Sequence, residues 1–203
     1  PQARTISGLL GAGAIDALTR AGWDWPAESQ QVSTRDGALL VRLPGRDRAL
    51  LISADADTTA TATPEALAAW EAGAVRAGEY MVPAAASEQL QPQEIDYHTL
   101  QGVSYQKGCY LGQEIVARLY FRGQLKSALT WLQADWPADA GSAPQRGQHL
   151  TSGGSKVGEV IQAVWPDEGR LWLLAQLRLE SGPASLRLDD GRELALTALS
   201  FER

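Results

Sequence analysis

The apolar pattern of the chain changes at Gly123, and this change constrains the fold more than any other feature. Beyond this glycine, short apolar runs alternate with turns rich in glycine, proline or aspartate, which is typical of β-strands in an all-β unit. The predicted strands cover residues 126–133, 156–164, 171–179, 184–188 and 193–200. The triplet Asp189-Asp190-Gly191 is a hairpin-turn signal. We therefore predict a small antiparallel β-barrel over residues 123–203.

The part of the chain before Gly123 mixes helix and strand signals. Strands are predicted at residues 4–10, 38–43 and 48–53, and helices at 12–20, 64–71 and 112–121. Pro44-Gly45 separates two of these strands, as in a hairpin. This order favours an α+β fold with helices on one side of a sheet. A chain of 203 residues is long enough for two domains, which we place at 1–122 and 123–203.

The net charge and the cysteine content exclude several classes of function and of metal site. The net charge of −6 argues against a general nucleic-acid binder, because such proteins neutralise phosphates with cations. One cysteine excludes an internal disulfide and a self-contained four-cysteine zinc or iron–sulfur site. No window approaches about 18 consecutive apolar residues, and the first residues lack the apolar core of a signal peptide. We expect a cytoplasmic monomer with no direct nucleic-acid or membrane partner.

The cysteine lies in a segment that suits binding, Lys107-Gly108-Cys109-Tyr110-Leu111-Gly112-Gln113-Glu114. A nearby cation and a helix N-terminus favour the reactive thiolate form of cysteine, and Lys107 and the predicted helix supply both. Glycines on either side allow positive φ and the close approach of a ligand. The alternative is a buried structural cysteine in a strand-to-helix turn, since free cysteine is often buried.

Cations are concentrated between Lys107 and Lys126. This segment also contains Arg118 and Arg122 but only one acidic residue, Glu114, so it carries +3 and the remainder of the chain carries −9. Glu114, Arg118 and Arg122 are spaced by four and share one face of the predicted helix. The pattern indicates either an anion site or a solvated surface ladder of ion pairs, which contributes little to stability.

The octapeptide, continued by Arg118, Phe121-Arg122-Gly123 and Lys126, closely resembles the signature of the YgfZ family of folate-binding proteins, relatives of the aminomethyltransferase of glycine cleavage. Supporting matches are Trp70, Arg76-Ala77-Gly78 and Pro92-Gln93, and the resemblance weakens outside the middle third of the chain. Leu111 departs from the small or polar residue often found there, and Ser127 from a second basic residue after Lys126.

The resemblance implies the C-terminal two-thirds of a YgfZ-like fold, with the N-terminal part expected to be absent, and tetrahydrofolate as cofactor. The implied folate-binding residues are Trp70, Lys107, Tyr110, Gln113, Glu114, Arg118 and Arg122, with Cys109 as the functional thiol. In this hypothesis Gln113 or Glu114 faces the pterin, and the arginines bind the carboxylates of the glutamate tail. For Trp70, packing in the core is an equally good interpretation.

Three functions stay open. The first is a folate-dependent factor for assembly or repair of iron–sulfur clusters and, through iron–sulfur enzymes or assembly proteins as partners, for tRNA modification. Cys109 would then attack a one-carbon electrophile, resolve a mixed disulfide, or lend one thiolate to a shared cluster. The others are an aminomethyltransferase-like one-carbon enzyme and a folate-free interaction module. His98 and His149 have no carboxylate spacing typical of a metal site, so none is predicted.

Overall fold

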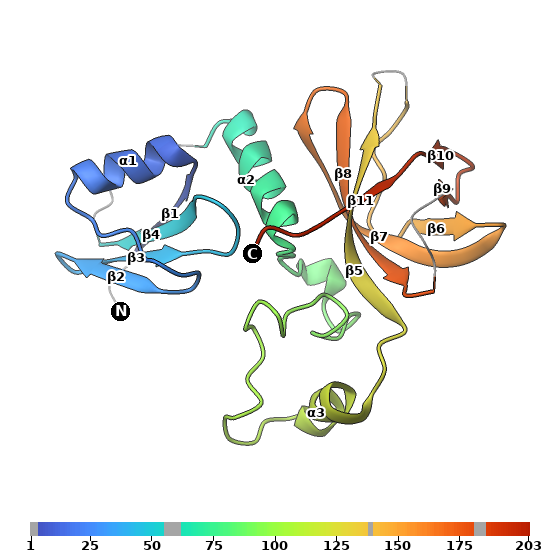
Figure 1. Cartoon of the computed structure of the whole chain (residues 1–203), viewed down its shortest axis with the longest axis horizontal. Coiled ribbons are helices and arrows are strands. Elements are labelled where there is room, and N and C mark those ends of the chain that lie inside the picture. Colours follow the sequence, from blue (N-terminus) through green and yellow to red (C-terminus); the bar gives the residue numbers. More distant parts are fainter. Residues whose placement is uncertain (1–3, 55–61, 138–139, 181–185) are drawn as a thin grey trace. The chain divides into compact units, whose positions relative to one another are not determined.

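The computed structural model describes residues 4–54, 62–137, 140–180 and 186–203. The chain forms two compact units, of which the first comprises the residues up to Ala77 together with Phe201–Arg203, and the second comprises Gly78–Ser200. Figure 1 labels the α-helices and strands of both units. Residues 78–122 thus group with the C-terminal strands, whereas the predicted boundary follows residue 122. Whether the units are separate domains stays a prediction.

The first unit contains a four-stranded antiparallel sheet in the order β1-β4-β3-β2. Exposed and half-buried residues alternate along β1, as a strand with one solvated face requires. Leu18, Leu40 and Ala49 form the buried core. The elements are β1 (Thr5–Leu10), α1 (Ala12–Arg20), β2 (Val32–Arg35), β3 (Ala38–Arg42), β4 (Arg48–Ser53) and α2 (Pro64–Ala77). The predicted first strand, first helix and hairpin are confirmed, whereas β2 was not predicted.

Helix α2 continues six residues beyond its predicted end at Glu71. The helix includes Gly73, which lowers the helix propensity of this stretch. A β-carbon at Gly73 would lie only 3.0 Å from Cδ of Arg48, so the glycine lets the helix approach this side chain closely. Arg48 is 1% exposed and donates a hydrogen bond of 3.0 Å to the carbonyl of Pro44. Packing therefore outweighs local propensity here.

The second unit begins with irregular chain that includes the short helix η1 (Ala84–Ala86) and leads to helix α3 (Gln113–Arg122). A seven-stranded antiparallel sheet follows, in the order β10-β9-β6-β7-β8-β5-β11. Its strands are β5 (Ser127–Asp135), β6 (His149–Ser152), β7 (Ser155–Asp167), β8 (Arg170–Arg178), β9 (Leu186–Leu188), β10 (Glu193–Leu194) and β11 (Thr197–Leu199). The predicted strands 126–133, 156–164, 171–179 and 184–188 are found, although residues 184 and 185 lie outside the described ones. The prediction of one strand over 193–200 is wrong, because Ala195 and Leu196 separate β10 from β11, which pair with different strands. Strand β6 was not predicted.

The sheet of the second unit is strongly rolled. Strands β10 and β11 lie at opposite ends of the strand order, yet only Ala195 and Leu196 separate them in the sequence. Three residue steps span at most about 11 Å, so the two ends of the sheet must approach each other. Among the described strands no pairing joins β10 to β11, and the predicted barrel is therefore a rolled sheet without a closed ring of hydrogen bonds.

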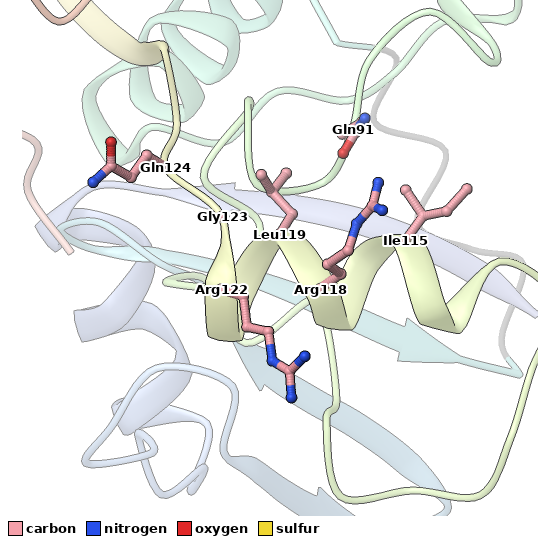
Figure 2. A pocket seen from close by; sticks show the side chains of 7 residues that line it. All are labelled: Gln91, Ile115, Arg118, Leu119, Arg122, Gly123 and Gln124. Atoms are coloured by element: carbon pink, nitrogen blue, oxygen red, sulfur yellow. The ribbon is translucent and has the colours of Figure 1, made fainter.

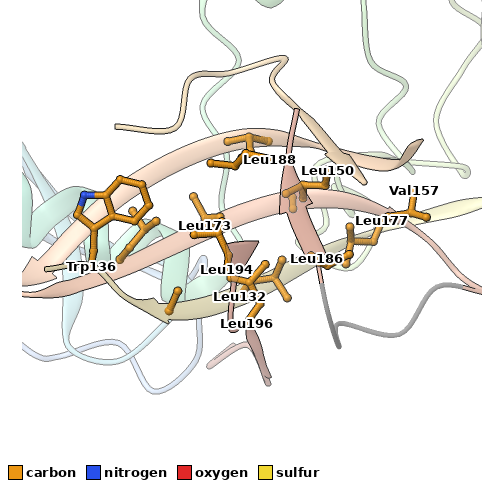
Figure 3. Close-up of a cluster of buried hydrophobic side chains, with 14 residues drawn as sticks. Leu132, Trp136, Leu150, Val157, Leu173, Leu177, Leu186, Leu188, Leu194 and Leu196 are labelled. Atoms are coloured by element: carbon orange, nitrogen blue, oxygen red, sulfur yellow. The ribbon is translucent and has the colours of Figure 1, made fainter. Parts of the chain in front are cut away.

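Rolling the sheet encloses a leucine-rich core (Figure 3). Alternate residues of β8 point into it, namely Leu171, Leu173, Ala175 and Leu177. Burying one leucine side chain contributes about 1.5–3 kcal/mol, so this core accounts for a large part of the stability of the unit. Across the described residues, no helix has the length and apolar character needed to cross a membrane.

Candidate functional site

Helix α3 carries most of the predicted site. It begins after Gly112, whose φ of 82° is left-handed, and no side chain caps its N-terminus. Left-handed backbone is unfavourable for residues other than glycine, which explains a glycine at this position of the octapeptide. Gly108 does not have a positive φ, so only one of the two glycines around the cysteine meets that expectation. The predicted helix is confirmed.

A pocket of about 320 Å³ opens beside α3. Its lining residues come from the helix and from the chain on either side of it: Gln91, Ile115, Arg118, Leu119, Arg122, Gly123 and Gln124. Its volume lies at the lower end of the range of roughly 300–1,000 Å³ that is typical of small-molecule pockets. Ile115 and Leu119 supply apolar surface, and two guanidinium groups supply positive charge. The pocket therefore suits a ligand that is partly apolar and carries an anionic group.

The two arginines of the pocket point in different directions. Figure 2 shows the guanidinium of Arg118 on the side of Gln91 and Ile115, whereas that of Arg122 extends away from them. Each guanidinium presents several N–H donors and can bind a carboxylate through two of them. The arrangement is therefore better suited to two separate anionic groups, or to one group bound by Arg118 alone. It is less suited to a single carboxylate bound by both arginines.

The cations of this segment are not neutralised locally. Within the described part of the chain, no carboxylate lies within ion-pair distance of Lys107, Arg118, Arg122 or Lys126. Glu114 is exposed and forms no ion pair with Arg118 one turn further along the helix. The predicted alternative of a surface ladder of ion pairs is therefore not observed, which leaves these positive charges available to an anionic ligand.

Cys109 is exposed, so the alternative of a buried structural cysteine is wrong. The residues around it form no helix or strand, and the neighbouring Leu111 is fully exposed, which leaves the thiol open to a partner molecule. The ammonium group of Lys107 lies 4.9 Å from the centre of the Tyr110 ring, in a cation–π contact. Lys107 and Tyr110 thus contact each other beside the cysteine.

The sequence predicts eight site residues, and the pocket brings two of them together, Arg118 and Arg122. Gln113 is the half-buried first residue of α3, and Glu114, which follows it, is exposed. Lys107, Cys109 and Tyr110 precede the helix and do not line this pocket. Gln91 and Gln124 line it but were not predicted. Neither belongs to the octapeptide, and spacing along one helix could not identify residues outside that helix.

Trp70 belongs to the first unit, whereas the other predicted site residues belong to the second. The indole is half-buried, and the guanidinium of Arg48 lies 4.6 Å from its ring centre. A β-carbon added to Gly8 would lie 3.1 Å from Cζ3 of Trp70, so the ring also lies against strand β1. These contacts give the ring a packing role within its own unit.

A second group of side chains holds the inner side of α3. Gln93 is 3% exposed, and its Nε2 donates a hydrogen bond of 2.7 Å to the carbonyl of Val116. The ring of Tyr105 stacks on that of Tyr120, with 4.0 Å between the centroids, and Phe121 contacts both edge to face. Desolvation raises the pKa of Tyr105 above its ordinary value, while its hydrogen bond with Gln93 lowers it in part. Gln93 and Phe121 belong to the sequence matches that carry the family resemblance, whereas nothing in the sequence pointed to Tyr105 or Tyr120.

Among the described residues, no three His, Cys, Asp or Glu side chains are placed to hold a metal ion. His98 instead lies 3.5 Å from a carboxylate oxygen of Asp96 and contacts the ring of Tyr120 edge to face. The pocket on α3 is suited to an anionic, partly apolar molecule, and an exposed thiol lies shortly before the helix.

Curated proteins with similar sequences include three named tRNA-modifying protein YgfZ. The one from Yersinia enterocolitica is 35% identical over 133 residues, which are 63% of this chain and 39% of that protein. The one from Serratia proteamaculans is 35% identical over 134 residues, with the same shares. The one from Yersinia pestis is 37% identical over 112 residues, which are 53% of this chain and 33% of that protein. The chain thus matches about two-fifths of the length of these relatives or less. No family model matches it.

A solved structure, the glycine cleavage system aminomethyltransferase T from Bartonella henselae, resembles this chain with a TM-score of 0.67 and 16% identity. The likeness covers 97% of this chain and 58% of the aminomethyltransferase chain. It confirms the predicted α+β fold class. Together these similarities confirm the resemblance to the YgfZ family that the octapeptide carries, and they show that the chain has the fold of a glycine cleavage aminomethyltransferase.

Proposed function

We propose that this chain binds tetrahydrofolate and acts as a folate-dependent factor in tRNA modification, in the cytoplasm. The relatives' name and the aminomethyltransferase-like fold support the proposal. The observation that carries it is the pocket on α3, where Arg118 and Arg122 lie beside Ile115 and Leu119. A reduced folate has the same two properties in one molecule, an aromatic body and a tail of carboxylates.

The residues present fit the tail end of a folate. Arg118 and Arg122 have no carboxylate partner among the described residues, so each can bind a carboxylate without breaking an ion pair. Ile115 and Leu119 offer apolar surface for the benzoyl part. Gln113 and Glu114, in the first turn of the same helix, are the proposed partners of the polar edge of the pterin. Trp70, in the first unit, stays a predicted folate-binding residue.

Tetrahydrofolate, when bound, supplies a carrier for one-carbon units. The contribution proposed for this chain is the thiol of Cys109, with Lys107 and Tyr110 beside it. Because the thiol is exposed, a partner protein can reach it. We propose that it serves iron–sulfur enzymes or their assembly proteins in one of two ways. Its thiolate exchanges with a mixed disulfide on the partner, so that Cys109 forms a disulfide with one sulfur and the other sulfur leaves as a thiolate, or it is one ligand of a cluster that the partner carries. One cysteine cannot hold a cluster alone.

The test is calorimetric titration of the chain with tetrahydrofolate. Arg118→Ala removes a charge-assisted interaction worth about 1.5–3 kcal/mol, which corresponds to a Kd raised roughly 10- to 150-fold. Arg178→Ala is the matched control, since Arg178 is an exposed arginine at the end of β8 in the same unit. Trp70→Ala is expected to weaken binding, and Cys109→Ser to leave it unchanged.

Each outcome separates the candidate functions. Saturable binding that depends on Arg118 but not on Cys109 supports a folate site beside a separately acting thiol. If the chain does not bind, the titration is repeated with a chain extended at its N-terminus, and failure there refutes the folate proposal. A chain that binds no folate and tolerates Cys109→Ser in every assay of tRNA modification is an interaction module instead.

A further inference from the structure

Helix α3 requires support from outside itself. It has ten residues, none of them buried, and no side chain caps its N-terminus. Isolated helices shorter than about 12–15 residues are marginal in water. The positions of Arg118 and Arg122 at the pocket therefore depend on the contacts that hold the helix. Those contacts lie on a different face from the one that carries the two arginines.

The support centres on the amide of Gln93. Its Nε2 lies 2.7 Å from the carbonyl oxygen of Val116 and 3.3 Å from the hydroxyl oxygen of Tyr105. Tyr105 in turn stacks on Tyr120, with ring planes 19° apart. Val116 and Tyr120 are separated by one helical turn, so they lie on the same face of α3. One side chain thus contacts the helix directly and also contacts the ring that stacks on it.

Packing alone does not explain why residue 93 is a glutamine. In the part of the chain that the structure describes, two polar or charged residues are buried, and Gln93 is one of them, at 3% exposure. Its Oε1 is buried and has no hydrogen-bond partner among the described residues. An apolar side chain of similar size would avoid that unsatisfied acceptor. The amide donor, which holds the middle of α3, is therefore the feature that distinguishes glutamine from leucine at this position.

We propose that Gln93 is the positioning residue of the folate site: its amide fixes the rotation of α3, and thereby the direction in which Arg118 and Arg122 face. This inference rests on the proposed function for its ligand. Gln93 itself does not line the pocket, so it acts through the helix. Removing the amide is expected to loosen α3 without altering the leucine-rich core of the sheet.

The experiment compares Gln93→Leu with Gln89→Leu. Gln89 is an exposed glutamine of the same unit whose Nε2 also donates to a backbone carbonyl, that of Ala85, at 2.9 Å. Hydrogen exchange of the α3 amides and tetrahydrofolate titration are measured on both variants and on the unaltered chain. We expect at least tenfold faster exchange in α3 and at least tenfold weaker binding for Gln93→Leu, and neither change for Gln89→Leu.

Gln93→Glu provides a nearly isosteric test that also distinguishes positioning from packing. A carboxylate cannot donate to the carbonyl of Val116, whereas a protonated carboxyl group can. Protection of the α3 amides, corrected for intrinsic exchange rates, is therefore expected to return as the pH is lowered through the pKa of the introduced group. The unaltered chain and Gln89→Leu should show no such transition.

Two results would overturn the inference. One is equal α3 protection in Gln93→Leu and Gln89→Leu, which would mean that the amide does not hold the helix. The other is faster exchange with unchanged affinity, which would separate the helix from the pocket. If the unaltered chain binds no tetrahydrofolate, the proposed function fails, and the exchange comparison with the pH response of Gln93→Glu still decides whether Gln93 positions α3.

Discussion

Replacing Gly123 with alanine tests how closely the backbone is packed at the C-terminal end of α3. A β-carbon at Gly123 would lie 2.7 Å from the carbonyl oxygen of Leu119, 2.7 Å from its Cδ1 and 2.8 Å from its Cα. Two of these three atoms belong to the backbone, so a change of rotamer cannot relieve the clash. The φ of −88° and ψ of 162° at Gly123 are allowed for alanine, so the penalty is steric rather than conformational.

The magnitude follows from two opposing effects. Overpacking costs about 1–3 kcal/mol, whereas a glycine-to-alanine change at an allowed conformation stabilises a protein by about 0.4–1 kcal/mol through the unfolded chain. The clash prevails, with a net cost of about 1–2 kcal/mol. Because α3 contributes no buried residue, we expect the last helical turn to shift or fray rather than the whole unit to unfold. Leu119 and Arg122 would then leave the pocket.

Hydrogen exchange of the amides in the last turn of α3 measures this effect directly. A cost of about 1–2 kcal/mol corresponds to roughly 5- to 30-fold faster local opening, with a similar loss of tetrahydrofolate affinity and a smaller change in global unfolding by urea. Gly108→Ala is the control, because open space surrounds its added β-carbon and its φ is not positive. Equal exchange rates in the Gly123→Ala and Gly108→Ala chains would refute the reasoning.

Three further predictions concern the two units. Gly158→Ala should lower the free energy of unfolding by about 3 kcal/mol, since its β-carbon would clash with the backbone carbonyl oxygen of Gln176 in the paired strand β8; urea unfolding that shows no loss contradicts this. The side-chain hydrogen bond from Arg192 lowers the pKa of Asp190 from 3.8 to about 2. The stability it contributes is therefore present above about pH 4 and lost between about pH 4 and pH 2. The carboxylate is 40% exposed, so the contribution is only about 0.2–1 kcal/mol, and Asp190→Asn should flatten the pH dependence of urea unfolding in that window. Gly8→Ala should move the indole of Trp70, which would lie 3.1 Å from the new methyl group, and the indole N–H resonance of Trp70 in NMR spectra should shift.

Much of the fold was predictable because local signals and packing agree in most elements. Strand β1, helix α1 and the β3–β4 hairpin follow from apolar periodicity and from the turn residues Pro44-Gly45. The predictions failed where the structure of a segment depends on contacts with residues outside that segment. Gly73 weakens the helix signal but allows α2 to pack on Arg48. The four-residue strand β6 was missed because it begins with His149 and ends with a serine in a polar stretch, and its identity depends on pairing with β7 and β9.

The candidate site was predictable only along one helix. The four-residue spacing of Arg118 and Arg122 placed both on one face, and both line the pocket. Periodicity cannot show that Gln91 approaches that face from more than twenty residues upstream, or that Gln93 holds the opposite side. The exposure of Cys109 was also not predictable, because residue type alone favours burial of a free cysteine.

The exposed position of Cys109 has a practical consequence. It is the chain's one cysteine, so a maleimide reagent will attach a single label at a known place, three residues before the left-handed turn that starts α3. A fluorophore there would report movements of the neighbouring helix without any engineered cysteine. Because the thiol is exposed, two purified chains can be oxidised by air to a disulfide-linked dimer. A reducing agent should prevent this dimer from forming.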